Sequence, residues 1–292
     1  MPIISSTGVL ENLSLDMISE IRYTVEHNAP MVQLVEDHKL SKGQDQGLFP
    51  KVGQMTVRRL AEGEEMTNEQ DMGLTTLTVN TNEVGGYIVI TEKALRRTQA
   101  SAGNLFSVIA RQFGDAQSRL MNEDLVGLFA SVNGGTDSGG VGLAFTAANA
   151  TNLVSIAYTE KLGRDLKIVH HPNTVMRLLQ DLTTIGSGTL RPIPDGYSSD
   201  LLGKSWAGAM IWDVPVFQTG DITRDGADDA IGAIFDKACF GVLHEGQMRS
   251  DKEYKNRRRA WELVFVEEYI AFEIDDSKGL FVTADAVNPT LA

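Results

Sequence analysis

The sequence predicts an α+β fold in which one very long helix follows a strand-rich hairpin and precedes a region of mixed short elements. Three observations support this class. Segments between residues 54 and 91 are rich in β-formers, apolar residues recur at helical period after Ser101, and strand-like and helix-like segments alternate from residue 166 onward. The chain has 292 residues, of which 42% are hydrophobic and 22% are charged, so it can bury a sizeable core.

The first fifty residues, 1–50, are expected to form an N-terminal arm. Apolar residues recur at helical spacing from Leu10 to His27, which predicts a short amphipathic helix that ends before Pro30. The stretch up to Gly53 is polar and Gly-rich, as a surface segment would be. The opening residues do not resemble a signal peptide, and no apolar run approaches the roughly 20 residues that span a bilayer. We therefore expect a chain made in the cytoplasm that has no membrane partner.

Residues 51–92 are predicted to form an extended loop built as a β-hairpin. The segments QMTVRRL and LTTLTVNT are its strand candidates, the acidic stretch AEGEEMTNEQDMG lies between them, and GGYIVIT follows as a third strand. A hairpin of this length with few large apolar residues has no core of its own. We therefore expect it to pack on another domain or on another chain.

The clearest helix in the sequence begins after Ser101. Its apolar face is marked over roughly seven turns, at about 3.6 residues per turn, by Leu105, Ile109, Phe113, Ala116, Leu120, Leu125 and Leu128. The Gly-rich stretch at 133–142 is expected to end it. The remaining chain predicts a strand ending near His170, a helix that begins at Pro172, and strands within AGAMIWDVPVFQTGDI, AIGAIFDKACFGVL and AWELVFVEEYIAFEI.

Catalytic and ligand-binding patterns are poorly represented. The Gly-rich stretch lacks the Lys-Ser/Thr of a phosphate-binding loop and follows a helix where a dinucleotide fingerprint needs a strand. His170 and His171 are neighbours on a predicted strand end, and adjacent strand residues point to opposite faces, which disfavours joint metal binding. The single cysteine, Cys239, has no partner for a disulfide or a zinc cluster. The sequence therefore predicts no enzymatic activity, no cofactor and no metal site.

Three consecutive arginines, Arg257, Arg258 and Arg259, stand out because the chain carries a formal net charge of -13. Residues 251–260 hold five basic and two acidic residues, a local balance of +3. Proteins that grip DNA through its phosphates usually carry basic charge over a whole face, whereas here acidic residues outnumber basic ones by 39 to 26. The net negative charge of the chain would repel DNA, which disfavours nucleic-acid binding by this arginine run.

The order of these parts resembles the major capsid proteins of tailed bacteriophages, the family with the HK-ninety-seven-like fold, over nearly the whole chain. GGYIVITEKALRRT resembles the return from that family's extended loop, and Gln99 to Ser131 resembles its long spine helix. IVHHPNTVMRLLQDL is similar to the strand and helix that enter its axial domain, and MIWDVPVFQTGDI is similar to a recurrent Val-Pro-Val core strand. The run from AIFDKACFGVL to VEEYIAFEI resembles the closing return to its peripheral domain.

The resemblance implies four regions: an N-terminal arm at 1–50, the extended loop at 51–92, a peripheral domain with the spine helix at 93–160 and 251–292, and an axial domain at 161–250. It implies a major capsid protein that self-assembles, in pentamers and hexamers, into an icosahedral shell enclosing double-stranded phage DNA without sequence preference. The expected location is the virion, after assembly in the host cytoplasm. Separate scaffolding, portal and decoration proteins are the further partners that it suggests.

The same resemblance suggests contacts between subunits. The arginine run would lie near a subunit boundary, where its electrostatic partner is the acidic loop tip of a neighbouring chain. The candidate contact residues in that loop are Arg58, Arg59, Glu62, Glu64 and Glu65. A solvated strand entry is the alternative interpretation of the arginine run, because exposed ion pairs are worth only about 0–1 kcal/mol each.

Some members of this family cross-link their subunits through isopeptide bonds from a lysine in the extended loop. No lysine lies between Lys51 and Lys93, so no such cross-link is expected here. Little sequence precedes the arm, so we expect either a mature form of the chain or scaffolding from a separate protein. Two other functions stay open from the sequence: a cellular encapsulin-type nanocompartment shell, which would package an enzyme in place of DNA, and a cytosolic enzyme whose site the sequence does not reveal.

Overall fold

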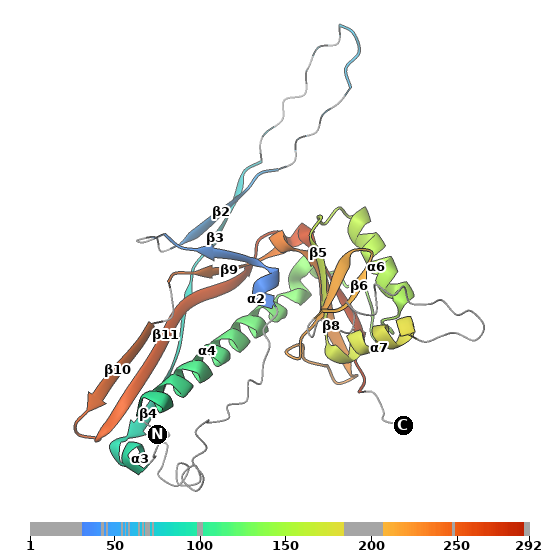
Figure 1. The fold of residues 1–292 in the computed structure, drawn as a ribbon. Helices are drawn as coiled ribbons and strands as arrows, with labels where there is room; N and C mark the ends of the chain where they lie inside the picture. Colours follow the sequence, from blue (N-terminus) through green and yellow to red (C-terminus); the bar gives the residue numbers. More distant parts are fainter. Residues whose placement is uncertain are drawn as a thin grey trace.

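The computed structural model of the chain describes residues 31–288, apart from 42–43, 45, 54, 56, 58, 64, 66, 68–70, 72, 98–101, 184–206 and 247–248. The helix predicted at Leu10–His27 lies outside the described residues. Within them, the mixture of helices and sheets confirms the predicted α+β class (Figure 1). Two five-stranded sheets form the body of the molecule, and a two-stranded ribbon projects from it.

The first five-stranded sheet, called here the long sheet, is built around strand β11 (Ala260–Glu273). β4 (Asn82–Thr91) pairs antiparallel with one edge of β11, and β10 (Arg249–Lys255) and β9 (Phe240–His244) share the other edge. β1 (Glu36–Lys39) extends the sheet as a parallel partner of β9. Because β11 pairs on both edges, it ties together segments that are more than 150 residues apart in the sequence.

Helix α4 (Ala102–Gly127) lies along one face of the long sheet, and it matches the long helix predicted after Ser101. Its 26 residues correspond to about 40 Å at roughly 1.5 Å per residue. Phe113 stacks on Phe265 of β11 with ring centroids 4.2 Å apart. A Cβ at Gly86 would come within 2.5 Å of the Phe113 ring, so the missing side chain lets helix and sheet approach closely.

The second sheet, called here the compact sheet, has the strand order β12-β8-β5-β7-β6. Its strands are β5 (Leu166–His170), β6 (Ala207–Ile211), β7 (Val214–Gln218), β8 (Asp229–Asp236) and β12 (Gly279–Asp285). β5 is buried along its whole length, as expected for a central apolar strand that is covered on both faces. Helices α6 (Ala147–Thr159) and α7 (Pro172–Thr183) pack on one face, and α7 begins at the predicted proline.

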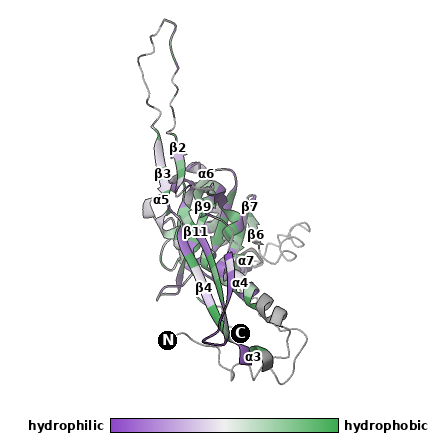
Figure 2. Ribbon diagram, turned by 90° about the vertical axis from the view of Figure 1, so that its left-hand side faces the viewer, coloured by the Kyte–Doolittle hydropathy of each residue, from purple (hydrophilic) through white to green (hydrophobic). Residues whose placement is uncertain are grey.

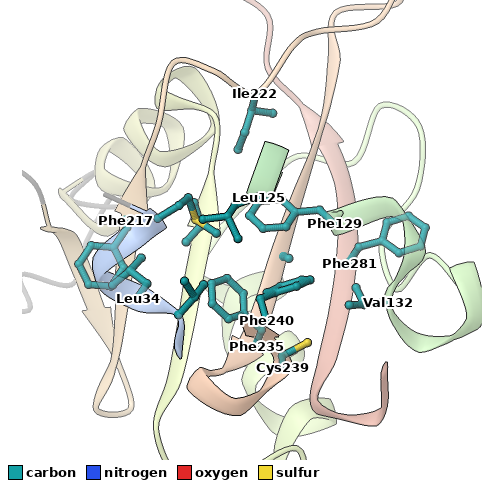
Figure 3. Packing of buried hydrophobic residues seen from close by; sticks show 14 of the residues in the cluster. Leu34, Leu125, Phe129, Val132, Phe217, Ile222, Phe235, Cys239, Phe240 and Phe281 are labelled. Atoms are coloured by element: carbon teal, nitrogen blue, oxygen red, sulfur yellow. The ribbon is translucent and has the colours of Figure 1, made fainter. Parts of the chain in front are cut away.

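The other face of the compact sheet packs against the long-sheet half of the molecule in one continuous core (Figure 3). Phe217 and Phe235 come from the compact sheet, Leu125 and Phe129 from the end of α4 and the turn that follows it, and Phe240 from β9. The ring centroid of Phe129 lies 5.9 Å from those of both Phe235 and Phe240. Each half therefore depends on the other to bury this core.

Short elements complete the described chain. They are α2 (Met31–Leu34), α3 (Glu92–Arg97), α5 (Val132–Gly135) and three 3-10 turns at Phe129–Ser131, Lys237–Cys239 and Asp276–Lys278. Helix α2 contributes Met31 and Leu34 to the central core, and the Met31 N–H donates to Asn122 Oδ1 of α4 at 3.1 Å. The chain therefore enters the described fold directly beside the long helix.

The first strand of the extended loop differs from the prediction. It is β2 (Gly47–Lys51), which pairs with β3 (Thr75–Val79) and begins inside the range assigned to the arm. The described residues of QMTVRRL form no strand. Pro50 argues against a strand in a sequence reading, but β2 belongs to a two-stranded ribbon with an open edge, where a residue without an N–H is tolerated.

The predicted ranges 161–250 and 251–292 each contribute strands to both five-stranded sheets. β12 lies in 251–292, assigned to the peripheral domain, yet it pairs with β8 in the compact sheet. α6 lies in 93–160 but packs on the compact sheet, while β9 lies in 161–250 but pairs with β11 of the long sheet. Hydrogen bonding across space decides which sheet a strand joins, and a linear division of the sequence cannot represent these crossings.

Candidate assembly surfaces

The β2–β3 ribbon leads away from the body, at the end of the molecule opposite α3 (Figure 2). Beyond it, the described residues of 52–74 form no helix or strand. Their large apolar side chains are exposed, and Val57 has 95% of its surface accessible. The exposed set in this region is Val52, Met55, Val57, Leu60 and Leu74, with Leu48 and Leu77 in the ribbon. Apolar surface gathered in this way marks a site of interaction with another molecule.

Contacts at the base fix the direction in which the ribbon projects. The Phe49 ring lies 4.8 Å, centroid to centroid, from Phe272 of β11 and 4.9 Å from the His38 ring. Lys51 Nζ donates to Asp275 Oδ1 at 2.5 Å. Partial burial raises the pKa of Asp275, but the hydrogen bonds from Lys51 and Ser277 outweigh it and hold the pKa below its ordinary value. The ribbon is therefore anchored at its base and uncovered along its length.

The charged residues predicted for the loop are partly described. Arg59, Glu62 and Glu65 lie in the loop with exposed side chains, while Arg58 and Glu64 fall outside the described residues. The loop and the arginine run lie at opposite ends of the folded molecule (Figure 1). A contact between them therefore requires two copies of the chain.

The arginine run forms the turn between β10 and β11, where the sequence predicted an irregular entry to a strand. Lys255 pairs with Ala260, so residues 256–259 close the hairpin, and Arg259 has a left-handed backbone with φ of 48°. All three arginines are exposed. Arg258 Nη1 forms an ion pair with Glu262 Oε1 at 2.9 Å, whereas the described part of the chain provides no such partner for Arg257 or Arg259.

The residues behind this turn hold it against helix α3. Tyr254 Oη donates to Glu92 Oε2 at 3.0 Å, and the Glu92 N–H donates to the Arg259 carbonyl at 2.9 Å. Lys252 Nζ lies 4.4 Å from the centroid of the Trp261 ring, a cation–π contact. Lys93 of α3 is exposed beside the turn. This end of the molecule thus concentrates positive charge in a chain that is acidic overall.

The face of the long sheet that points away from α4 is open over much of its length. Alternation along β4 places Gly86 against α4, so Tyr87 points to the other face, where its cross-strand neighbour Val264 is also exposed. Glu83, Glu245 and Glu268 line a cavity of about 280 Å³ beside them. A hydrogen bond with Glu245, together with its charge, raises the pKa of Glu268. An apolar strip with an acidic margin therefore faces solvent.

The two chemically reactive side chains of the core are held in their neutral forms. His170 is buried, and desolvation lowers its pKa to about 3, while its Nδ1 accepts the His171 N–H at 2.8 Å. Burial likewise raises the pKa of the Cys239 thiol. Among the described residues no group of three or more His, Cys, Asp or Glu side chains is placed to hold a metal ion. No helix in the same part of the chain is long and apolar enough to cross a membrane.

Comparison with known proteins gives these surfaces their context. Residues 74–275 match the family described as phage capsid protein, which is more than half of the chain. The chain belongs to the phage capsid protein family. This membership confirms the predicted role as a capsid shell protein and a structural role in the virion. No curated protein sequence matches the chain at a significant level.

Solved structures share the fold at low sequence identity. The capsid of a native GTA particle has a TM-score of 0.70 at 14% identity and covers 93% of this chain and 95% of its own. The capsid of the cyanophage Pam1 has a TM-score of 0.70 at 12% identity, with coverages of 91% and 94%. An encapsulin from Synechococcus elongatus has a TM-score of 0.67 at 9% identity, with coverages of 100% and 99%. The HK-ninety-seven-like fold that the sequence resemblance implied is thereby confirmed.

Sequence reasoning missed the apolar part of these surfaces. It singled out charged residues in the loop and described the hairpin as poor in large apolar residues, whereas Met55, Val57 and Leu60 are exposed there. It gave no role to Tyr87 and Val264, because a sequence does not reveal which face of a sheet is left open. The exposed loop residues could have been found, since they interrupt an otherwise polar stretch.

Proposed function

We propose that this chain builds a closed icosahedral shell of pentamers and hexamers that encloses the double-stranded DNA of a tailed phage. The exposed apolar loop is the observation that carries the proposal. Its side chains have no cover in the described chain, although burial of apolar surface is worth about 25 cal/mol per Å². Another subunit would supply that cover, and repetition around the shell would multiply each weak contact.

The open face of the long sheet is the surface on which a neighbour's loop would lie. Tyr87 and Val264 offer an apolar strip that matches side chains such as Val57 and Met55 in chemistry. The acidic margin formed by Glu83, Glu245 and Glu268 disfavours contact with the acidic part of the loop. We therefore place the apolar flanks of the loop on this strip and its acidic tip farther along, toward the basic end of the neighbouring subunit.

Charge complementarity supports that arrangement. The loop tip carries Glu62 and Glu65, and the opposite end of the molecule carries Arg257 and Arg259, which the described part of the chain leaves unpaired. Arg258 is already paired with Glu262, so it contributes less than its two neighbours. A head-to-tail contact of this kind generates closed rings or shells when its rotation closes.

Deletion of Gly63–Met72 tests the proposal. The deleted chain should stay soluble as a monomer or capsomer, because the loop lies outside the core, while electron microscopy should show shells for the intact chain only. A matched control replaces the same segment with a Gly/Ser stretch of equal length, which keeps the reach of the loop and its exposed apolar residues, so it should assemble better than the deletion. Normal shells from the deletion would contradict the role given to the loop.

The packaged content separates this function from a second candidate. The similarity to an encapsulin extends over 100% of this chain, so a nanocompartment shell is the alternative. Purified particles should contain nuclease-protected double-stranded DNA when they are produced with the phage packaging machinery. A packaged enzyme in place of DNA would favour the alternative. Separate scaffolding and portal proteins, decoration proteins and assembly in the host cytoplasm belong to the proposed phage function.

A further inference from the structure

The turn between β6 and β7 holds a tryptophan in an unfavourable backbone conformation. Ile211 pairs with Val214, so Trp212 and Asp213 alone form the turn, with φ of 51° and 63°. Turns of this kind favour Asn-Gly, because residues with a large side chain rarely adopt the left-handed region. The chain therefore carries a locally costly residue at this position.

The described part of the chain gives Trp212 no packing partner that would offset this cost. It is 73% exposed, and Met210 beside it is 52% exposed. Alternation along the hairpin explains why. Ile211 and Val214 point into the core under α6 and α7, so Met210 points to the opposite face, on the side where Phe217 packs into the central core. Met210 thus lies on the face that α2 and α4 cover farther along the sheet, and Trp212 follows it in the turn.

The two edge strands of the compact sheet differ in how far the described residues cover them. Along β12, the N–H groups of Ser138 and Gly140 donate to the carbonyls of Phe281 and Thr283 at 3.0 and 3.1 Å, so the same chain covers this edge. β6 is the other edge strand, and among the described residues its one strand partner is β7. An open edge with exposed apolar side chains is a surface that natural proteins usually protect.

We propose that Trp212, with Met210, is an anchor that a second copy of this chain covers when subunits assemble. The inference rests on the proposed shell function and adds a contact on the compact sheet, away from the loop. A second copy is the occupant that the observations favour, because a capsid protein assembles with further copies of itself. Met210 also continues an interior face of the fold at an edge that the described residues leave uncovered. Aromatic side chains of this type are the usual anchors of protein interfaces.

Fluorescence tests the burial directly. Replacing Trp206 and Trp261 with Phe leaves Trp212 as the single tryptophan of the chain. We expect its emission to shift to shorter wavelength on assembly and its iodide quenching constant to fall at least threefold. Equal quenching in free subunits and shells would overturn the inference. Shielding that appears only after a different protein is added to finished shells would overturn it as well.

A turn replacement separates an interface role from a structural one. The double change Trp212→Asn with Asp213→Gly supplies the residues that this turn favours, so the free subunit should melt at the same or a higher temperature. The subunit concentration needed for assembly should rise at least tenfold. Val141→Asn, at another exposed apolar residue (79%), is the matched control and should change neither. Unchanged assembly of the double variant would overturn the inference while the shell function stands, whereas failure of the wild-type chain to form shells would overturn both.

Discussion

The two sheets of this protein differ in how much of their surface the chain itself covers. The compact sheet is buried by α6 and α7 on one face and by the central core on the other, and the described residues leave its β6 edge uncovered. The long sheet has α4 on one face, an open opposite face and a projecting ribbon with exposed apolar residues. Apart from the β6 edge, the first half is therefore completed within one subunit, whereas the second requires neighbours over a whole face and along the ribbon. Substitutions in the two halves should affect different measurements.

The largest expected effect comes from the central core. Phe235→Ala removes a fully buried ring that contacts Phe129 and Phe240, and it should lower the free energy of unfolding of the subunit by about 3–5 kcal/mol. Val57→Ser, in the exposed loop, should leave that free energy unchanged and reduce assembly. Urea denaturation and assembly yield, measured on both variants, give the comparison. A destabilised Val57→Ser subunit would show that the loop packs within its own chain.

Acid should lower the free energy of unfolding of the subunit through His170, which is buried at the end of β5 in the compact sheet. The pKa of His170 is lowered from 6.5 to about 3 by burial, so the unfolded chain binds a proton that the folded chain does not bind between these values. Stability is therefore complete well above pH 6.5 and is lost as the pH falls, by about 2 kcal/mol at about pH 5. His170→Gln should flatten this dependence in urea titrations of the free subunit. An unchanged pH dependence in the variant would assign the acid sensitivity to other groups.

The arginine run should affect assembly by a smaller amount. Arg259→Gly removes an exposed charge at a left-handed position that suits glycine, so the subunit should remain stable while assembly weakens by a few fold, consistent with about 0–1 kcal/mol per contact. Lys161→Gly is the matched control, because Lys161 is also exposed and left-handed, with φ of 58°, but lies in the compact half.

A salt titration distinguishes the nucleic-acid alternative for the same residue. If the arginine run gripped DNA, wild-type subunits would bind duplex with a steep dependence on salt, and Arg259→Gly would reduce that slope while shells formed normally. We expect weak binding to duplex before and after the change, because the chain carries a net charge of -13.

The last comparison concerns covalent cross-links between neighbouring subunits, which we expect to be absent. No lysine lies between Lys51 and Lys93, and Lys51 is already paired with Asp275 at the base of the ribbon. Boiled and reduced particles should therefore run on a denaturing gel as a single chain near 31.8 kDa. A ladder of covalent oligomers would reveal a cross-linking pair elsewhere in the subunit.

Local patterns in the sequence were sufficient to predict several helices. The helical spacing from Leu105 to Leu128 predicted α4, and the proline at 172 predicted the start of α7, because both signals act within a few residues of the chain. The order of these elements was sufficient to suggest the capsid family. The absence of a loop lysine is likewise a property of the sequence alone.

Long-range pairing was decided only by the tertiary structure. The sequence could not assign β12 to the compact sheet or β2 to the ribbon, because a strand's partner depends on hydrogen bonds across space. It could not show that Arg258 is paired with Glu262 while Arg259 has a left-handed backbone in a hairpin turn. Nor could it show that Trp212 is exposed, since only packing determines whether the side chain of a turn residue is covered.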